Sequence, residues 1–356
     1  MSRRYVMKKI LDLQKCIIDV YNGYACTTSI ILGKNEGRNW FVQNYLNYMV
    51  SYNENYDYVI CDYFYSDIFY NTAINCFQPE NMVSFPYNCY SVPATEVNDI
   101  IDFVKKILNR EFYICLFVNL KYLSNYYKTQ DFIHDIFIYG YDDEKRVIYS
   151  TGYIGGKKYA KVEHTFDEII EAYNNTNVES IVHNRFDTNR ITFFKYKENF
   201  IYQFNIDKFI WTLKEYLNIS NYCKYIKREV YLNTTSDTKT VYGIEGINII
   251  INYLKTLNAR KSLDVRQIYF LYNHKRNMKY KLQFLYEHKY IPNNKIVDEY
   301  EVIIKNTNIC LNIAIKYSLV KRVELINDMI ILLKKIYLLE YNILNDLISI
   351  LNKKIC

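Results

Sequence analysis

The stretch IHDIFIYGYDDEKRVIYSTGYIGGKKY, residues 133–159, decides the fold of this chain. Apolar and other residues alternate on both sides of the turn sequence Gly-Tyr-Asp-Asp-Glu, residues 140–144. Alternation with a period of two that is interrupted by turn-forming residues is typical of a β-hairpin. The pattern therefore predicts a hairpin over residues 132–152, with His134 near the start of its first strand.

Patterns around the hairpin predict a mixed α+β first half. Turn signals and short apolar runs indicate several strands, expected near residues 56–70, 112–120, 179–183 and 191–196, with a loop or edge strand at 86–93. Apolar spacing of three and four residues indicates helices, expected near residues 24–32, 39–51 and 95–109. Thr165-Phe-Asp-Glu168 resembles a capping box that opens a further helix, which reaches Tyr173.

The pattern changes near residue 205. Helical spacing dominates the rest of the chain, over residues 206–217, 246–257, 265–290 and 298–352. A chain of 356 residues is long enough for two domains. We therefore expect an α+β domain over residues 1–203 and a mostly helical domain over residues 204–356.

Charge is distributed unevenly along the chain. The formal net charge is +7, with −3 over residues 1–200 and +10 over residues 201–356. The basic second half favours an acidic partner. Its lysines and arginines are scattered without a nucleic-acid-binding motif, so nucleic acid is not expected as a partner. No run of about 18 apolar residues is present, so a membrane span is not expected either.

The nine cysteines are spread along the chain without a C-x-x-C pair. This spacing does not fit a zinc ribbon or an iron–sulfur cluster, and we expect neither a metal nor a cofactor. The basic N-terminus lacks the uninterrupted apolar run of a secretory signal. An odd cysteine number without such a signal favours reduced thiols and a cytoplasmic location.

Three residues could carry Cys/His chemistry. A neutral His134 imidazole could accept a proton from a thiol, although a lone histidine in a strand is more often structural. Cys26 lies at the start of an expected helix, where the dipole stabilises a thiolate, although cysteine is commonly a small buried apolar residue. The second hairpin strand offers no carboxylate or amide at residues 149–152, which leaves Asn119 as the candidate that orients the imidazole.

A second polar group falls on one expected helix and comprises Asp264, Arg266, His274 and Lys275. The eight residues from Arg266 to His274 place these side chains roughly on one helical face. Such a face is either a structural set of salt bridges or a surface that binds substrate or a partner.

Several motifs together resemble a known family. These are the cysteine near the N-terminus, H-x-x-x-x-Y-G-Y-D-D-E from His134, and the later F-D-E-I helix. Their order is similar to that of the butirosin biosynthesis protein H N-terminal family. Y-G-I-E-G-I-N at 242–248, L-D-V-R at 263–266 and Y-N-H-K at 272–275 resemble relatives found beside peptide-synthetase genes. The resemblance implies a papain-like, cysteine-peptidase-like first domain.

The resemblance also implies roles for individual residues. The family's base falls on His134. Its nucleophile falls on Cys26 if the Ala-Cys step is aligned, but on Val20 if the Asp19-x-Tyr21-Asn22 step is aligned. The family's acid falls near Ser150 or Thr151, and neither is a carboxylate.

Three functions are compatible with this reading. The first is an acyltransferase of secondary-metabolite biosynthesis, in which Cys26 takes an acyl group from an acyl or peptidyl carrier protein and passes it to a small-molecule amine. The second is a catalytically degenerate binding or assembly protein of the same fold. The third is a cysteine peptidase.

Overall fold

The computed structural model describes residues 7–63, 85–126, 130–154, 158–176, 189–218, 238–257 and 262–355. The chain divides into two compact units: unit 1 is Met1–Gly37 with Phe85–Ile201, and unit 2 is Arg38–Ser84 with Tyr202–Cys356. The boundary expected at residues 203 and 204 lies close to the last crossing between units. The segment Arg38–Ser84, however, groups with the helical unit, so the chain crosses between units more than once.

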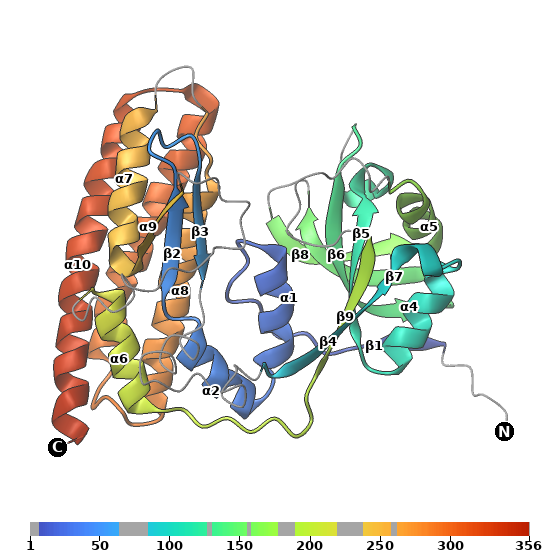
Figure 1. Ribbon diagram of the computed structural model, residues 1–356, viewed down its shortest axis with the longest axis horizontal. Coiled ribbons are helices and arrows are strands. Elements are labelled where there is room, and N and C mark those ends of the chain that lie inside the picture. Colours follow the sequence, from blue (N-terminus) through green and yellow to red (C-terminus); the bar gives the residue numbers. More distant parts are fainter. Residues whose placement is uncertain are drawn as a thin grey trace. The chain divides into compact units, whose positions relative to one another are not determined.

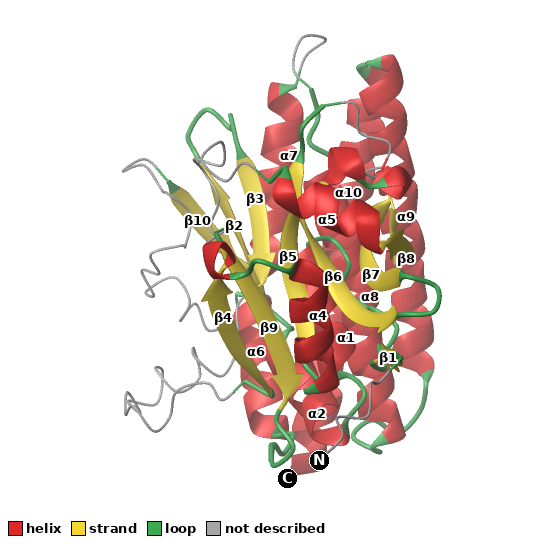
Figure 2. Cartoon of the chain, turned by 90° about the vertical axis from the view of Figure 1, so that its right-hand side faces the viewer, coloured by secondary structure: helices red, strands yellow, loops and turns green. Residues whose placement is uncertain are grey.

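In the described residues, unit 1 is built on an antiparallel sheet of seven strands. Figure 2 shows β9, β5 and β6 following one another across it, in the order β4-β9-β5-β6-β7-β8, and β1 pairs with β6. The strands are β1 (Lys8–Ile10), β4 (Tyr87–Pro93), β5 (Tyr113–Asn119), β6 (Ile133–Asp142), β7 (Val147–Ile154), β8 (Lys158–Thr165) and β9 (Arg190–Tyr196). The predicted hairpin is β6 with β7, and the segment 86–93 forms the edge strand β4.

Helices cover both faces of this sheet. One face packs against α4 (Ile100–Asn109) and α5 (Phe166–Asn174) and carries the larger apolar core, which includes Ile114, Leu116 and Ile136. The other face packs against α1 (Asn22–Ile31), with Phe137 and Cys26 in a smaller cluster. Figure 1 shows α1 on one side of the strands and α4 and α5 on the other. Side chains therefore alternate along β6 between two different helical layers.

A bulge in β6 adjusts this alternation. The pairing with β7 shifts between Ile138 and Gly140, so Ile138 and Tyr141 both reach the larger core. Gly140 lies where β1 crosses closely, and a Cβ there would come 2.8 Å from the Lys9 carbonyl oxygen. Glycine is thus required at this point for β1 to pair with β6.

Local signals explain two helix starts in unit 1. The capping box predicted at Thr165 and Glu168 is confirmed: the Thr165 hydroxyl accepts from the Glu168 amide, and the Glu168 carboxylate accepts from the Thr165 amide. The helix expected from residue 95 starts at Ile100, because the Asp99 side chain caps it by accepting from the Asp102 amide.

Unit 2 combines a small sheet with long helices. Its strands, in the order β10-β2-β3, are β10 (Lys239–Tyr242), β2 (Tyr48–Tyr52) and β3 (Val59–Tyr63). Its helices are α2 (Asn35–Asn44, which begins in unit 1), α6 (Ile206–Tyr216), α7 (Gly246–Thr256), α8 (Arg266–Glu287), α9 (Lys295–Val320) and α10 (Glu324–Ile355). No helix in the described ranges is long and apolar enough to cross a membrane.

The helix expected over residues 39–51 is a helix followed by a strand. Helix α2 ends at Asn44, and side chains of α8 bond to carbonyls in its last turn and just after it. His274 Nε2 bonds to the Leu46 carbonyl at 2.8 Å, and the Lys281 side-chain nitrogen donates to two carbonyls of α2, Phe41 at 2.8 Å and Val42 at 2.9 Å. These bonds tie the early segment to the helical unit.

Candidate functional site

A buried polar cluster lies between α1 and β6 in unit 1. Its centre is the Asp135 carboxylate, whose Oδ2 accepts from Asn22 Nδ2 at 2.5 Å and from the Cys115 thiol at 3.6 Å. Its Oδ1 lies 2.9 Å from His134 Nδ1. Burial opposes ionisation of Asp135, but its bonds to His134 and Asn22 and the charge of His134 outweigh burial and lower its pKa. The cluster is thus organised around an ionised carboxylate.

Cys26 belongs to this cluster and not to the surface. Its side chain is only 2% exposed, and its thiol donates to Asn22 Oδ1 at 3.5 Å and lies 3.9 Å from the Tyr159 hydroxyl. Burial raises the pKa of this thiol well above its ordinary value, and the Asp135 charge raises it further. Cys26 is one helical turn inside α1, where it packs as a protonated core residue.

His134 takes the opposite register position from Asp135. Asp135 lies on the same face of β6 as Phe137, the face that packs against α1. His134 lies on the same face as Ile136, which packs toward α4 and α5. The His134 side chain is 38% exposed, and its ring stacks on Phe132 with centroids 5.8 Å apart. From the sequence we expect the Cys26 thiol and the His134 imidazole to contact each other directly. Instead, they are linked through other residues.

That link is a continuous chain of polar contacts. It runs from the Cys26 thiol to Asn22, from Asn22 to Asp135, and from Asp135 to His134. The group next to the thiol is an amide oxygen, which accepts a hydrogen bond but is too weak a base to remove the thiol proton. The geometry places both predicted residues in one network without making the imidazole the partner of the thiol.

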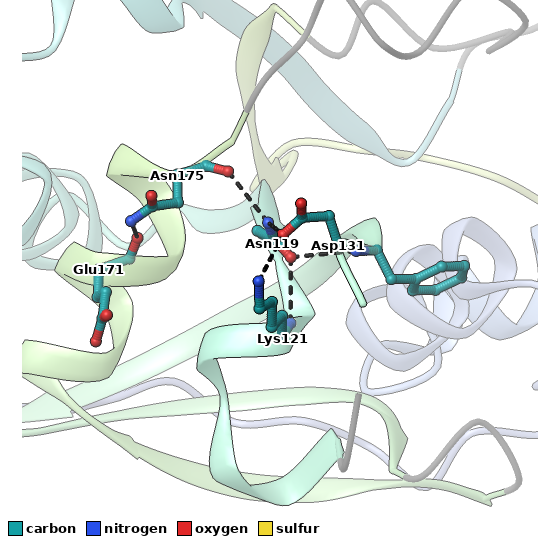
Figure 3. Close-up of polar contacts among 6 residues, drawn as sticks. Asn119, Lys121, Asp131, Glu171 and Asn175 are labelled. Atoms are coloured by element: carbon teal, nitrogen blue, oxygen red, sulfur yellow. Dashed lines mark hydrogen bonds and ion pairs between the residues drawn. The ribbon is translucent and has the colours of Figure 1, made fainter. Parts of the chain in front are cut away.

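Asn119 is fully engaged elsewhere. Figure 3 shows its amide between the loop after β5 and the end of α5. Nδ2 donates to Asp131 at 2.9 Å and to the Asn175 carbonyl at 3.2 Å, while Oδ1 accepts from the Lys121 and Phe132 amides, both at 3.2 Å. These four bonds use the whole capacity of the amide. The orienting role expected for Asn119 is therefore corrected to that of a loop anchor.

The hydroxyls expected at the acid position have other partners as well. Ser150 faces Ile138 in the register, and its hydroxyl lies 3.0 Å from His164 Nε2. The Thr151 hydroxyl lies 2.7 Å from the Tyr159 hydroxyl. Val20, the alternative nucleophile position, is a buried residue just ahead of α1.

The second predicted group does not form one surface. His274 and Lys275 are completely buried in unit 2, whereas Arg266 is exposed and pairs with Asp264 at 2.5 Å. Lys275 donates to Glu340 at 2.5 Å and to the Tyr216 hydroxyl at 3.0 Å, and it lies 3.3 Å from His274 Nδ1. The expectation of a binding face made by all four residues is corrected: two of them stabilise the interior of the helical unit.

A cavity of about 860 Å³ lies on the α1 side of unit 1. Ser29 and Ile30, one turn after Cys26, line it, while Cys26 itself does not. The remaining walls come from the segment before α1, from residues just after it and from the ends of β5 and β9. The described part of the chain contains no group of three or more His, Cys, Asp or Glu side chains arranged to hold a metal ion.

Sequence reasoning missed Asn22 and Asp135, the two residues at the centre of the cluster. One signal was available: Asp135 is a carboxylate in an otherwise apolar alternating strand, at a position that faces a helix layer. Asn22 gave no comparable signal, because its partner lies 113 residues away along the chain.

Comparison with known proteins adds no family assignment. The sequence matches no protein-family model, and it matches no curated protein.

Proposed function

We propose that this protein is a non-catalytic binding or assembly protein, in which a cysteine-peptidase-like domain of the butirosin biosynthesis protein H N-terminal type has lost its thiol chemistry. The order of a helix bearing Cys26 and a later hairpin bearing His134 supports the papain-like part of this proposal. One observation carries the functional part: the Cys26 thiol is buried and bonded to Asn22, and Asp135 stands between Asn22 and His134.

The chemistry follows from the ionisation of the thiol. Acyl transfer and peptide cleavage through cysteine both need a thiolate. Here burial and the Asp135 charge favour the protonated thiol, and the neighbouring amide cannot remove its proton. Retention of the architecture without a nucleophile favours binding over turnover.

Thiol labelling tests this proposal directly. Cys89 is an exposed free cysteine in the same unit and provides an internal control. With iodoacetamide at pH 7.5, we expect Cys89 to react at least about 100-fold faster than Cys26, because Cys26 is inaccessible and its thiol pKa is raised further than that of Cys89. Peptide mass mapping over time gives the two rates. Equal or faster alkylation of Cys26 overturns the proposal.

The acyltransferase is the second candidate, and the continuous chain from Cys26 to His134 favours it. In that reaction Cys26 Sγ attacks the carrier-protein thioester, the carrier thiol leaves, and an amine then takes the acyl group from Cys26. Incubation with an acylated carrier protein distinguishes the candidates. A covalent acyl adduct on Cys26 that is absent from Cys26→Ala supports the transferase, and its absence from a folded protein supports the binding function.

A further inference from the structure

The cavity of unit 1 has a composition suited to a particular class of ligand. Aromatic rings of Tyr113, Tyr196 and Phe200 form part of its wall. Charged side chains also line it: four carboxylates and two lysines, namely Asp12, Glu36, Glu111, Glu198, Lys34 and Lys195. Its volume of about 860 Å³ falls in the range of small-molecule sites.

Two of the four carboxylates in the cavity wall make no ion pair with a lysine in the described part of the chain and can bind a ligand. Lys195 lies 3.4 Å from both Glu111 and Glu198, and Lys9 lies 3.5 Å from Glu111, so two of the four acids are paired with lysines. Asp12 accepts from Gln14 at 2.8 Å, and neither Asp12 nor Glu36 makes an ion pair with any residue in the described ranges. The wall therefore carries an excess of negative charge.

Two tyrosines in the cavity wall have raised pKa values. Burial and the charges of Asp12 and Glu111 raise the pKa of Tyr113 to about 12. Burial and the charge of Glu36 raise the pKa of Tyr196 to about 12. Burial is the larger cause for both hydroxyls, and the neighbouring carboxylate charges add to it. Only the carboxylate contribution favours a cation.

The chain as a whole has the opposite charge. The formal net charge is +7 for the whole chain but −3 over residues 1–200, which hold all but one of the residues that line the cavity. A net charge of this size, spread over 200 residues and screened by salt, does not by itself define a binding site. Binding of a cation requires a local site in which carboxylates and aromatic faces are both present.

We propose that the unit 1 cavity binds a small organic amine in its ammonium form, of the size of an alkyl diamine or short polyamine. The ammonium groups pair with Asp12 and Glu36, and the alkyl chain packs on the aromatic wall. This inference rests on the proposed binding function and names the ligand class for it.

Matched probes test the charge preference. The probes are cadaverine, 1,5-pentanediol and glutarate, which share a five-carbon chain and differ in their terminal groups. Ligand-observed NMR and calorimetry on the full chain are expected to show saturable binding of cadaverine and none of glutarate. Equal binding of the diol, or stronger binding of glutarate, overturns the proposal.

Matched variants test the place of binding. Asp12→Asn with Glu36→Gln keeps side-chain size and is expected to weaken cadaverine binding about fivefold to tenfold. Lys34→Gln, at an exposed lysine of the same wall, is expected to leave binding unchanged or tighten it. The control is Glu54→Gln with Asp57→Asn, two exposed acids of unit 2 that make the same change in net charge. Equal weakening by this control overturns the site.

The outcome is separable from that of the proposed function. An acyl adduct on Cys26 overturns the binding function whether or not cadaverine binds. Absence of cadaverine binding in a folded protein without such an adduct overturns only the ligand assignment. Cys26→Ala is expected to leave cadaverine affinity unchanged, because Cys26 does not line the cavity.

Discussion

The two units each bury a polar network, but they do so in different surroundings. In unit 2, Lys275 pairs with Glu340, and Tyr216, Tyr300 and His274 complete the set, all completely buried. In unit 1, the network centred on Asp135 reaches from the buried Cys26 to the partly exposed His134. Both networks are polar, but the unit 2 network is completely buried, whereas the unit 1 network reaches the partly exposed His134. Access to solvent therefore distinguishes the candidate site from the structural network.

The difference also concerns how completely the groups are paired. Both ring nitrogens of His274 have partners, the Leu46 carbonyl and the Lys275 ammonium. His164 in unit 1 bonds to Ser150 through Nε2, but its buried Nδ1 has no hydrogen-bond partner among the described residues. The two histidines therefore differ in how fully they are paired, but the difference does not extend to the whole units, because buried Asn277 Oδ1 in unit 2 also lacks a hydrogen-bond partner among the described residues.

The largest expected effect comes from breaking the unit 2 ion pair. Glu340→Leu leaves the Lys275 ammonium buried without its carboxylate, and we expect a loss of about 3–5 kcal/mol in the free energy of unfolding. Urea unfolding followed by far-ultraviolet circular dichroism measures this loss. The double variant Lys275→Met with Glu340→Leu removes both charges and should recover at least half of the loss. A double variant as unstable as the single one contradicts the ion-pair account.

The next effect is a pH dependence in unit 1. Burial lowers the pKa of His164 to about 4, against a nearby Glu168 charge that raises it. The unfolded chain takes up a proton near pH 6.5, and the native state does so only near pH 4. Stability is therefore complete above pH 6.5 and falls as the pH drops toward 4, by about 3 kcal/mol for this group.

The matched variant for this prediction is His164→Gln, which keeps a polar group beside Ser150 and does not titrate. Urea unfolding from pH 7 to pH 4 gives the difference in stability between wild type and variant. We expect this difference to shift in favour of the variant as the pH falls. A difference that is independent of pH removes His164 as the cause.

The smallest expected effects compare two of the predicted catalytic residues. Asn119→Ala removes four hydrogen bonds, and we expect a loss of about 1–3 kcal/mol. His134→Ala removes a partly exposed ring, while Asp135 keeps its bonds to Asn22 and Cys115 and can take up a proton, so we expect a smaller loss than for Asn119→Ala. Thermal unfolding of the two variants side by side tests the ranking, which fails if His134→Ala is the more damaging change.

Local features were predictable from the sequence because their causes are local. The hairpin of β6 and β7 follows from alternation around a turn, and the helix start at Thr165 follows from a capping box within four residues. The α+β character of the first half and the helical second half follow from the same periodicities.

Long-range features could not be predicted in this way. Residues 39–51 look helical, but Tyr48–Tyr52 forms a strand that pairs on one side with the nearby β3 and on the other side with β10, about 190 residues later. His274 and Lys275 look like part of a polar face, but α8 turns them toward the interior, where Leu46 and Glu340 accept their bonds. Cys26 looked like a nucleophile at a helix start, and the Asn22–Asp135 contact that alters its environment joins residues 113 apart.

The pairing of β2 with β10 has a consequence for how the chain is made. On the ribosome, Tyr48–Tyr52 emerges long before Lys239–Tyr242, the strand that completes its sheet. Helix α8, which bonds to the carbonyls near the end of α2, is translated later still. Tyr48–Tyr52 can pair with β3 (Val59–Tyr63) as soon as both strands have emerged, but its other edge must wait for β10. A chain arrested near residue 200 therefore carries a hairpin with one unpaired edge, which is a target for chaperones.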